Sequence, residues 1–143
     1  MYQTLRSYAR PGLTVRITSF SYRAGIPSDE TGNGGGFVFD CRALPNPGRD
    51  ASFKKLSGLD PEVATWLNGQ PETAFFLGNM YNIVDQAVEN YITRGFQHLM
   101  VNFGCTGGQH RSVFSAEQLS RHLKQRYKIK IQLDHTNKNN WPA

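Results

Sequence analysis

Apolar and polar residues alternate in several segments of the chain, and this period of two predicts β-strands. Residues 13–23 alternate, with Val15, Ile17 and Ser19 on one face. Residues 37–44 begin with an apolar run, residues 99–103 form another, and residues 128–134 alternate again. The chain therefore supplies the strands of a small sheet.

Other segments repeat their apolar residues every three or four positions, which predicts amphipathic helices. This spacing runs from Pro71 to Arg94, where Gly95 ends it, and again from Ser112 to Tyr127. A shorter helix is expected after Asp60, because Asp60 is a good cap and Pro61 suits the first turn. Strands and helices together predict an α/β fold.

The order strand, helix, strand in residues 99–134 predicts a right-handed crossover between parallel strands. With 143 residues and 38% hydrophobic content, the chain fits one domain. We expect a single three-layer α/β domain with a mixed, partly parallel sheet. The predicted boundaries are a leader or linker at residues 1–12, the domain at 13–135 and a polar tail at 136–143.

Composition and charge indicate the cellular compartment of the protein and the kind of partner it binds. No apolar run is long enough for a membrane span, and the N-terminus lacks a signal-peptide core, so a cytoplasmic protein with reduced Cys41 and Cys105 is expected. The net charge of +5 and the pI near 9.4 favour anionic partners such as sugar phosphates or RNA. No metal-ligand spacing is present, and no cofactor is expected.

The most informative stretch lies between the strand at 99–103 and the helix that follows. Two glycines allow a tight turn, and the free N–H groups of the helix start face the same point, which favours anion binding. A guanidinium can hold a phosphate with two hydrogen bonds. The candidate ligand-binding residues here are Cys105, Thr106, Gly107, Gly108, Gln109, His110, Arg111 and Ser112.

This stretch allows two other interpretations. It lacks the Gly-Lys-Ser/Thr of a Walker loop, but Cys105, five further residues and Arg111 match the spacing of a cysteine-phosphatase loop. In that alternative Cys105 is the nucleophile and Arg111 the clamp, with no general acid assigned. The simplest alternative is a tight turn with a buried cysteine.

Two further charged groups are candidates. Asp40 and Arg42 follow a buried strand, where they either form an ion pair with each other or line the rim of the anion site. Late cations could bind an RNA backbone, or could form a solvated helix face. These late residues are Arg121, Lys124, Arg126, Lys128 and Lys130.

Four blocks, in this order, resemble the RapZ C-terminal domain family. They are Phe37–Arg42, Leu44–Pro47, Ser57–Asp60 and Gly104–Ser112, and the resemblance spans roughly residues 16–135. It implies a regulatory domain that senses glucosamine-6-phosphate or a similar amino-sugar phosphate and also binds small RNA. Asp40, Cys105, His110 and Arg111 match positions that are important in the family.

The chain departs from the family in three places. Gly48 replaces a histidine that contacts the ligand, and Asn137–Asn140 replaces a basic tail. The family's N-terminal Walker-loop domain has no counterpart in these 143 residues. The Gly32–Gly36 insertion resembles versions fused behind kinase-like domains, so a fused or partner kinase-like domain is one expectation. A homo-oligomer also stays open.

Overall fold

The computed structural model describes residues 12–142, so the predicted leader lies outside the described residues except for Gly12. The strands are β1 (Thr14–Ser21), β2 (Phe37–Asp40), β3 (His98–Cys105) and β4 (Lys130–His135). The helices are α2 (Pro61–Asn68), α3 (Pro71–Arg94) and α4 (Arg111–Arg126). Short 3-10 turns are η1 (Cys41–Ala43), η2 (Pro47–Arg49), η3 (Ala51–Phe53) and η4 (Lys138–Asn140).

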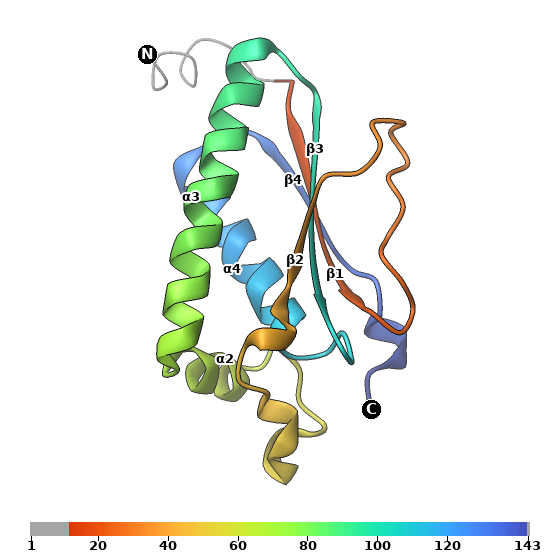
Figure 1. Ribbon diagram of the computed structural model, residues 1–143, viewed down its shortest axis with the longest axis vertical. Coiled ribbons are helices and arrows are strands. Elements are labelled where there is room, and N and C mark those ends of the chain that lie inside the picture. The colour runs from red at the N-terminus through yellow and green to blue at the C-terminus, as the bar shows by residue number, and fades with distance from the viewer. Residues whose placement is uncertain (1–11, 143) are drawn as a thin grey trace.

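The four strands form one sheet in the order β2-β3-β1-β4, and this confirms the predicted α/β class. All three strand pairings are parallel, which corrects the expectation of a mixed sheet. The helices lie on one side of the sheet, while the connection 22–36 runs along the other side (Figure 1). The third layer is therefore an extended connection instead of helices.

The core lies between the sheet and the helices. Val15, Ile17 and Val101 from the central strands are fully buried, as are Val84 of α3 and Leu119 of α4 in the same cluster. Their alternation along the strands and helical spacing along the helices bring these apolar side chains to one layer. This packing fixes the direction of β3 and α4, and therefore the loop between them.

Buried polar contacts join three of the strands. Thr18 Oγ1 donates to Asn102 Oδ1 at 2.7 Å, and Asn102 Nδ2 donates to the carbonyl of Phe37 at 3.0 Å. Thr18 and Asn102 are both buried, so these bonds offset the cost of removing them from water. They link β1 and β3 to the edge strand β2.

One predicted cap differs in detail. Asp60 is the N-cap residue of α2, but its side chain makes no capping bond. Its carboxylate accepts the N–H of Ser57 at 2.7 Å instead, because the chain turns sharply before the helix.

Among residues 12–142, no helix is both long and apolar enough to cross a membrane.

Gly104 illustrates how tightly β3 is packed where it enters the loop. A Cβ at this position would lie 2.4 Å from Phe20 Cζ and 2.6 Å from Tyr22 Cε2. We expect Gly104→Ala to lower the free energy of unfolding by about 1–3 kcal/mol, because the buried ring of Phe20 must move. Denaturant unfolding measures this loss.

The matched control is Gly78→Ala in the middle of α3. A Cβ there meets nothing within 4 Å, so the change should raise stability by about 0.5–1 kcal/mol through helix propensity. Equal stability of the two variants would contradict the crowding at Gly104.

Candidate functional site

The loop at residues 105–110 joins the carboxyl end of β3 to the first turn of α4. Gly108 has φ +61°, and a Cβ there would lie 2.8 Å from the backbone nitrogen of Ser21. Both the left-handed backbone and the close approach to β1 require glycine. The loop is therefore pressed against the end of β1.

The carbonyl groups of this loop all accept hydrogen bonds from the surrounding protein. Their donors come from β1 and its following turn, from the segment before α2, from the C-terminal tail and from α4 itself. The pairs are Cys105 with Tyr22 N, Thr106 with Ser21 Oγ, Gly107 with Asn137 Nδ2, Gly108 with Trp141 Nε1, Gln109 with Gly58 N, and His110 with Phe114 N, at 2.6–3.0 Å.

The N–H groups of the same loop are its free donors. Within residues 12–142, the backbone N–H groups of Thr106 to Arg111 have no acceptor. The N–H of Ser112 is directed to Cys105 Sγ at 3.4 Å. A run of such donors at the start of a 16-residue helix is a concentrated positive potential.

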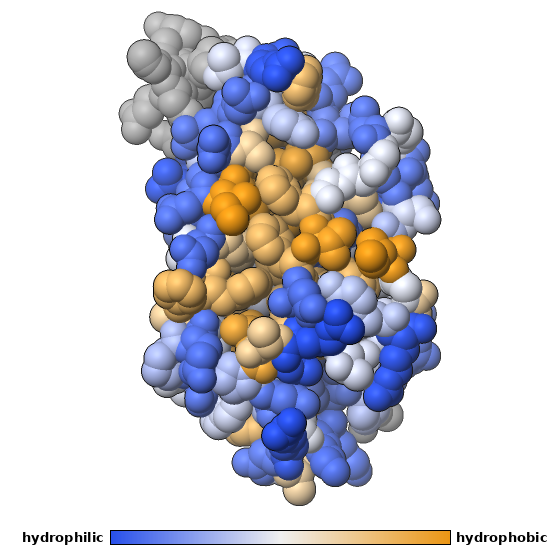
Figure 2. Space-filling view, in the orientation of Figure 1, coloured by the Kyte–Doolittle hydropathy of each residue, from blue (hydrophilic) through white to orange (hydrophobic). Residues whose placement is uncertain are grey.

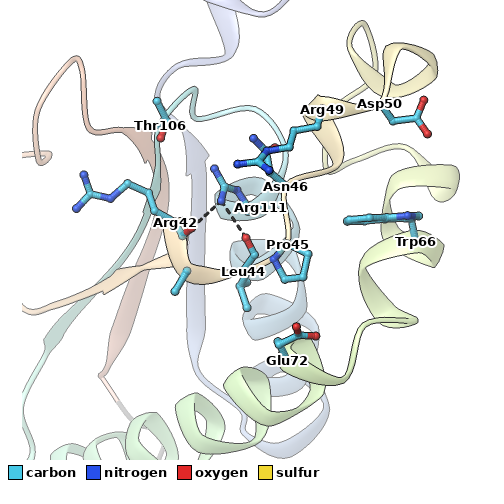
Figure 3. A pocket seen from close by; sticks show the side chains of 11 residues that line it. Arg42, Leu44, Pro45, Asn46, Arg49, Asp50, Trp66, Glu72, Thr106 and Arg111 are labelled. Atoms are coloured by element: carbon cyan, nitrogen blue, oxygen red, sulfur yellow. Dashed lines mark hydrogen bonds between the residues drawn. The ribbon is translucent and has the colours of Figure 1, made fainter.

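Arg111 is buried beside this loop and is held by backbone carbonyls. Its Nη1 donates to the carbonyls of Arg42 at 2.8 Å and Leu44 at 3.0 Å. Only 7% of the residue is exposed. These two bonds fix the guanidinium beside η1, at the wall of the pocket (Figure 3).

An open pocket of about 840 Å³ lies next to Arg111. Figure 3 shows the guanidinium of Arg49 beside that of Arg111, with Thr106 on the same side of the pocket. The lining residues are Arg42, Ala43, Leu44, Pro45, Asn46, Arg49, Asp50, Trp66, Glu72, Thr106 and Arg111. The pocket thus joins the loop to η2, α2 and the start of α3.

Several of these lining residues are absent from the sequence-based candidates: Asn46, Arg49, Asp50, Trp66 and Glu72. The Pro-rich turn indicated an irregular segment, and Arg49 follows it directly. Its direction depends on η2, whose cap is Asn46 Oδ1 accepting the N–H of Gly48 at 2.9 Å. No local pattern encodes that direction.

Gln109 and His110 lie at the loop but bind protein groups. Gln109 Nε2 donates to the carbonyls of Lys54 at 2.8 Å and Leu56 at 2.7 Å. His110 Nε2 lies 2.9 Å from the carbonyl of Phe53. Both side chains therefore position the segment that follows Arg49, and neither lines the pocket.

Asp40 and Arg42 contact each other closely. The Asp40 carboxylate accepts Nε and Nη2 of Arg42 at 2.9 and 2.8 Å, and these bonds lower the pKa of Asp40. The Arg42 guanidinium also lies 3.8 Å from the centre of the Tyr22 ring. Asp40 is thus paired within the protein, while Arg42 both pairs with it and lines the pocket.

Cys105 is buried under the loop. Its Sγ lies 3.1 Å from Ser112 Oγ, and only 3% of Cys105 is exposed. Ser112 is fully buried, and neither residue lines the pocket. Cys41 is also buried, with its Sγ 3.6 Å from Ser115 Oγ, and burial strongly raises the pKa of the Cys41 thiol.

The late cations lie at the other end of the domain. They lie on the last turns of α4, in the short connection after it and at the first residue of β4. This end of the domain is away from the loop that precedes α4 (Figure 1). All are exposed, and Arg126 Nε also lies 3.5 Å from Asp85 Oδ2. The structure therefore does not bring this basic segment to the pocket.

The C-terminal tail contributes to the site through the loop. Trp141 Nε1 and Asn137 Nδ2 hold two loop carbonyls, and Thr136 N donates to the carbonyl of Ser19 at 3.0 Å. The sequence predicts a polar tail at these positions, with Trp141 as a residue that could attach it to the domain. Within residues 12–142, no group of three or more His, Cys, Asp or Glu side chains could hold a metal ion.

Comparison with known proteins places this geometry in a family. The family model of the RapZ C-terminal domain matches residues 13–139. A nucleotide-binding protein of Solibacter usitatus (strain Ellin6076) is 39% identical over 111 residues, covering 78% of this chain and 33% of the relative. The nucleotide-binding protein NE1849 of Nitrosomonas europaea is 42% identical over 111 residues, covering 78% of this chain and 37% of the relative.

A more distant relative shows the same relation. A nucleotide-binding protein of Lactobacillus delbrueckii subsp. bulgaricus is 35% identical over 122 residues, covering 85% of this chain and 40% of the relative. The chain thus spans about two fifths or less of the length of these relatives. Because the family model covers nearly all described residues, the chain belongs to the RapZ C-terminal domain family.

Proposed function

We propose that this domain binds a small phosphorylated ligand, an amino-sugar phosphate of the glucosamine-6-phosphate type, and acts as a non-catalytic sensing domain. The observation that carries the proposal is the loop whose carbonyls are all bonded outward while its N–H groups stay free within the described residues. Such a loop is complementary to a phosphate group.

The phosphate would lie at the mouth of the loop. Arg111 is held rigidly by the Arg42 and Leu44 carbonyls, so little side-chain entropy is lost when it binds an anion. Arg49 adds a second guanidinium on the same side, and Thr106 adds a hydroxyl. Two cations suit the double negative charge of a phosphate monoester.

The rest of the ligand would extend along the pocket. Trp66 offers an apolar ring to a sugar face, and Asn46 offers an amide. The Glu72 and Asp50 carboxylates also line the pocket and could accept hydrogen bonds from an ammonium group. This distribution favours a zwitterionic ligand with phosphate at one end and an amine at the other.

The names of the relatives support a ligand that contains phosphate. They are called nucleotide-binding proteins, and those names refer to chains more than twice as long as this one. A nucleotide and a sugar phosphate share the phosphate group that the loop would bind. The pocket's carboxylates make an amino sugar the better candidate for this domain.

A cysteine-dependent phosphatase is the second candidate, because two groups of Ser112 contact the sulfur of Cys105. The Ser112 N–H is directed to Cys105 Sγ, and Ser112 Oγ lies 3.1 Å from the same sulfur. These donors would stabilise a thiolate at the helix start. The sulfur would form a bond to phosphorus as the bond to the leaving oxygen breaks, and water would then release phosphate. The 3% exposure of Cys105 argues against this reaction.

RNA is a further proposed partner. The exposed residues Arg121, Lys124, Lys128 and Lys130 form a basic end of the domain that is separate from the pocket. Exposed cations suit contacts to the phosphate backbone of RNA, which is the same whatever the base sequence. Ligand sensing and RNA contact would thus occupy opposite ends of the domain.

Arg49 offers a direct test of ligand binding, because it is exposed and can be replaced without disturbing the core. Arg49→Gln should weaken the binding of glucosamine-6-phosphate about tenfold, because one charged hydrogen-bond donor is lost. Isothermal titration calorimetry measures the affinity, with Arg121→Gln as the control at the other end of the domain. Glucosamine without phosphate should not bind.

Arg111→Lys tests the buried guanidinium in the same assay. A lysine keeps the charge, but both carbonyls and the phosphate would then compete for one nitrogen, whereas Arg111 bonds the carbonyls through Nη1 and keeps its other nitrogens for the anion. A larger loss than for Arg49→Gln is therefore expected. Circular dichroism and thermal unfolding check that the variant folds. Absence of saturable heat with any sugar phosphate in the wild-type chain would refute the proposal.

A separate prediction distinguishes binding from catalysis. We expect no hydrolysis of an aryl phosphate above the buffer rate, because Cys105 is covered by the loop. The measurement is release of the coloured phenolate, with Cys105→Ser and the matched variant Cys41→Ser. If the wild-type chain hydrolyses the aryl phosphate and only Cys105→Ser abolishes that activity, the phosphatase alternative is correct and the non-catalytic proposal is wrong.

The RNA proposal predicts a strong salt dependence. Fluorescence anisotropy with a single-stranded RNA should show affinity that falls steadily as salt increases, and Lys124→Gln with Lys128→Gln should reduce that slope. Arg49→Gln is the control because it lies at the opposite end. An affinity independent of salt would contradict a backbone contact.

A further inference from the structure

The face of the sheet opposite the helices carries a second pocket, with a volume of about 310 Å³. It lies at the amino ends of β1, β3 and β4, whereas the pocket beside Arg111 lies at the carboxyl ends of β2 and β3. Val15 points into the core, so its neighbours Thr14 and Arg16 point to this opposite face. The described lining residues of the two pockets do not overlap, and the second pocket is therefore a separate feature of the domain.

The register of the sheet builds the floor of this pocket. Thr14 of β1 pairs with His98 of β3 on one side and with Lys130 of β4 on the other, and each of the three is the first residue of its strand. Two residues further along, Arg16 pairs with Gln132 of β4. All five residues line the pocket, because residues two apart on neighbouring parallel strands share one face.

The other side of the pocket is formed by a covering segment, residues 29–35 of the connection between β1 and β2. None of residues 22–36 is buried, so this connection is not held by apolar packing. Figure 2 shows hydrophilic and neutral colours at the upper right, where the connection lies, in contrast to the apolar surface over α3 and β2. The covering segment must therefore be stabilised by polar contacts.

Asp29 supplies most of these contacts. Its carboxylate accepts the N–H groups of Thr31, Asn33 and Gly35 at 2.9–3.1 Å and the hydroxyl of Thr31 at 2.7 Å. Bonds from Thr31, followed by the N–H of Gly35, lower the pKa of Asp29 to about 2. The carboxylate is thus used within the covering segment and does not require a cation in the pocket.

Two contacts attach the covering segment to the sheet. Arg16 Nη1 donates to the carbonyl of Ser28 at 3.2 Å, just before the segment. Just after it, a Cβ at Gly36 would overlap the carbonyl of Met100 in β3, so the chain passes very close to the sheet there. The segment is held at both ends, and the pocket lies between it and the floor.

The pocket contains more hydrogen-bond donors than the described protein uses. Arg16 Nη2 is 3.9 Å from Asp134, a long and half-exposed ion pair, and Lys130 has no carboxylate partner in residues 12–142. The side chains of His98 and Gln132 make no hydrogen bond to any described residue. A guanidinium, an ammonium, an amide and an imidazole thus face one cavity.

The spacing of the two cations indicates the kind of ligand. Neighbouring strands are about 4.8 Å apart and residues rise about 3.3 Å along a strand, which places the Cα atoms of Arg16 and Lys130 about 8 Å apart on the diagonal. Two anionic groups on one small molecule fit this separation. A volume of about 310 Å³ is at the lower end for small-molecule sites and does not enclose a polynucleotide.

We propose that this pocket is a second ligand site, which binds a small metabolite carrying two or more negative charges, with Arg16 and Lys130 contacting its anionic groups. Gln132 and His98 add neutral donors, and the covering segment closes the outer side of the site. The proposal does not depend on ligand binding beside Arg111.

Nuclear magnetic resonance of the full 143-residue chain tests the proposal, because backbone amide shifts report where a ligand binds. The probes are citrate and inorganic phosphate, with acetate at the same ionic strength as the singly charged control. We expect saturable shifts at residues 29–35, 98–100 and 130–132, with a Kd of about 0.01–1 mM for the tighter probe. Acetate should bind at least tenfold more weakly than that probe, and the tighter probe identifies the anionic group.

Two charge-matched substitutions locate the site. Lys130→Gln should weaken binding of the tighter probe about tenfold, because one charged donor is lost. Lys128→Gln removes the same charge before β4, at a residue that does not line the pocket, and should have little effect. Arg49→Gln should also leave these shifts unchanged, which separates this site from the pocket beside Arg111.

Arg16→Gln distinguishes the pocket from the basic end of the domain, since Lys130 belongs to both and Arg16 only to the pocket. It should weaken binding at least as much as Lys130→Gln, and the amide spectrum of the variant shows whether it folds. Shifts confined to residues 105–112, or an affinity that neither substitution lowers, would overturn the proposal. The absence of saturation by either probe at about 10 mM would overturn it as well.

Discussion

The outward hydrogen bonding of the carbonyls in residues 105–110 is the constraint on which the candidate site depends. A tight loop contains equal numbers of backbone donors and acceptors, and its potential toward an anion would largely cancel if both faced the same way. Here the acceptors are bonded to surrounding segments, so only donors remain. The loop is suited to an anion because its other polar groups are already satisfied.

Those bonds also connect distant parts of the chain. Ser21 ends β1, Gly58 precedes α2, and Trp141 lies in the C-terminal tail, yet all three donate to this one loop. A shift in any of these segments would move a carbonyl and change the direction of the neighbouring N–H. The tail is therefore part of the site's architecture even though it does not line the pocket.

Arg111 performs a second connecting role. Charged hydrogen bonds to the Arg42 and Leu44 carbonyls, each worth roughly 1.5–3 kcal/mol, hold η1 against the start of α4. Gln109 and His110 hold the segment that follows Arg49, through the carbonyls of residues 53–56. Three consecutive residues thus organise one wall of the pocket, and only Arg111 of the three lines it.

The sequence alone determined the α/β class, the limits of α3 and the glycine-rich turn that leads into α4. These features are local: the period of apolar residues gives helices and strands, and paired glycines before a helix give a tight turn with free N–H donors. Only the tertiary structure decided which polar groups are already used. Asp40 pairs with Arg42, Gln109 and His110 bind carbonyls some fifty residues earlier, and Arg49 reaches the pocket from a separate turn. These outcomes depend on contacts between segments far apart in the chain, and residue spacing within a motif carries no information about them.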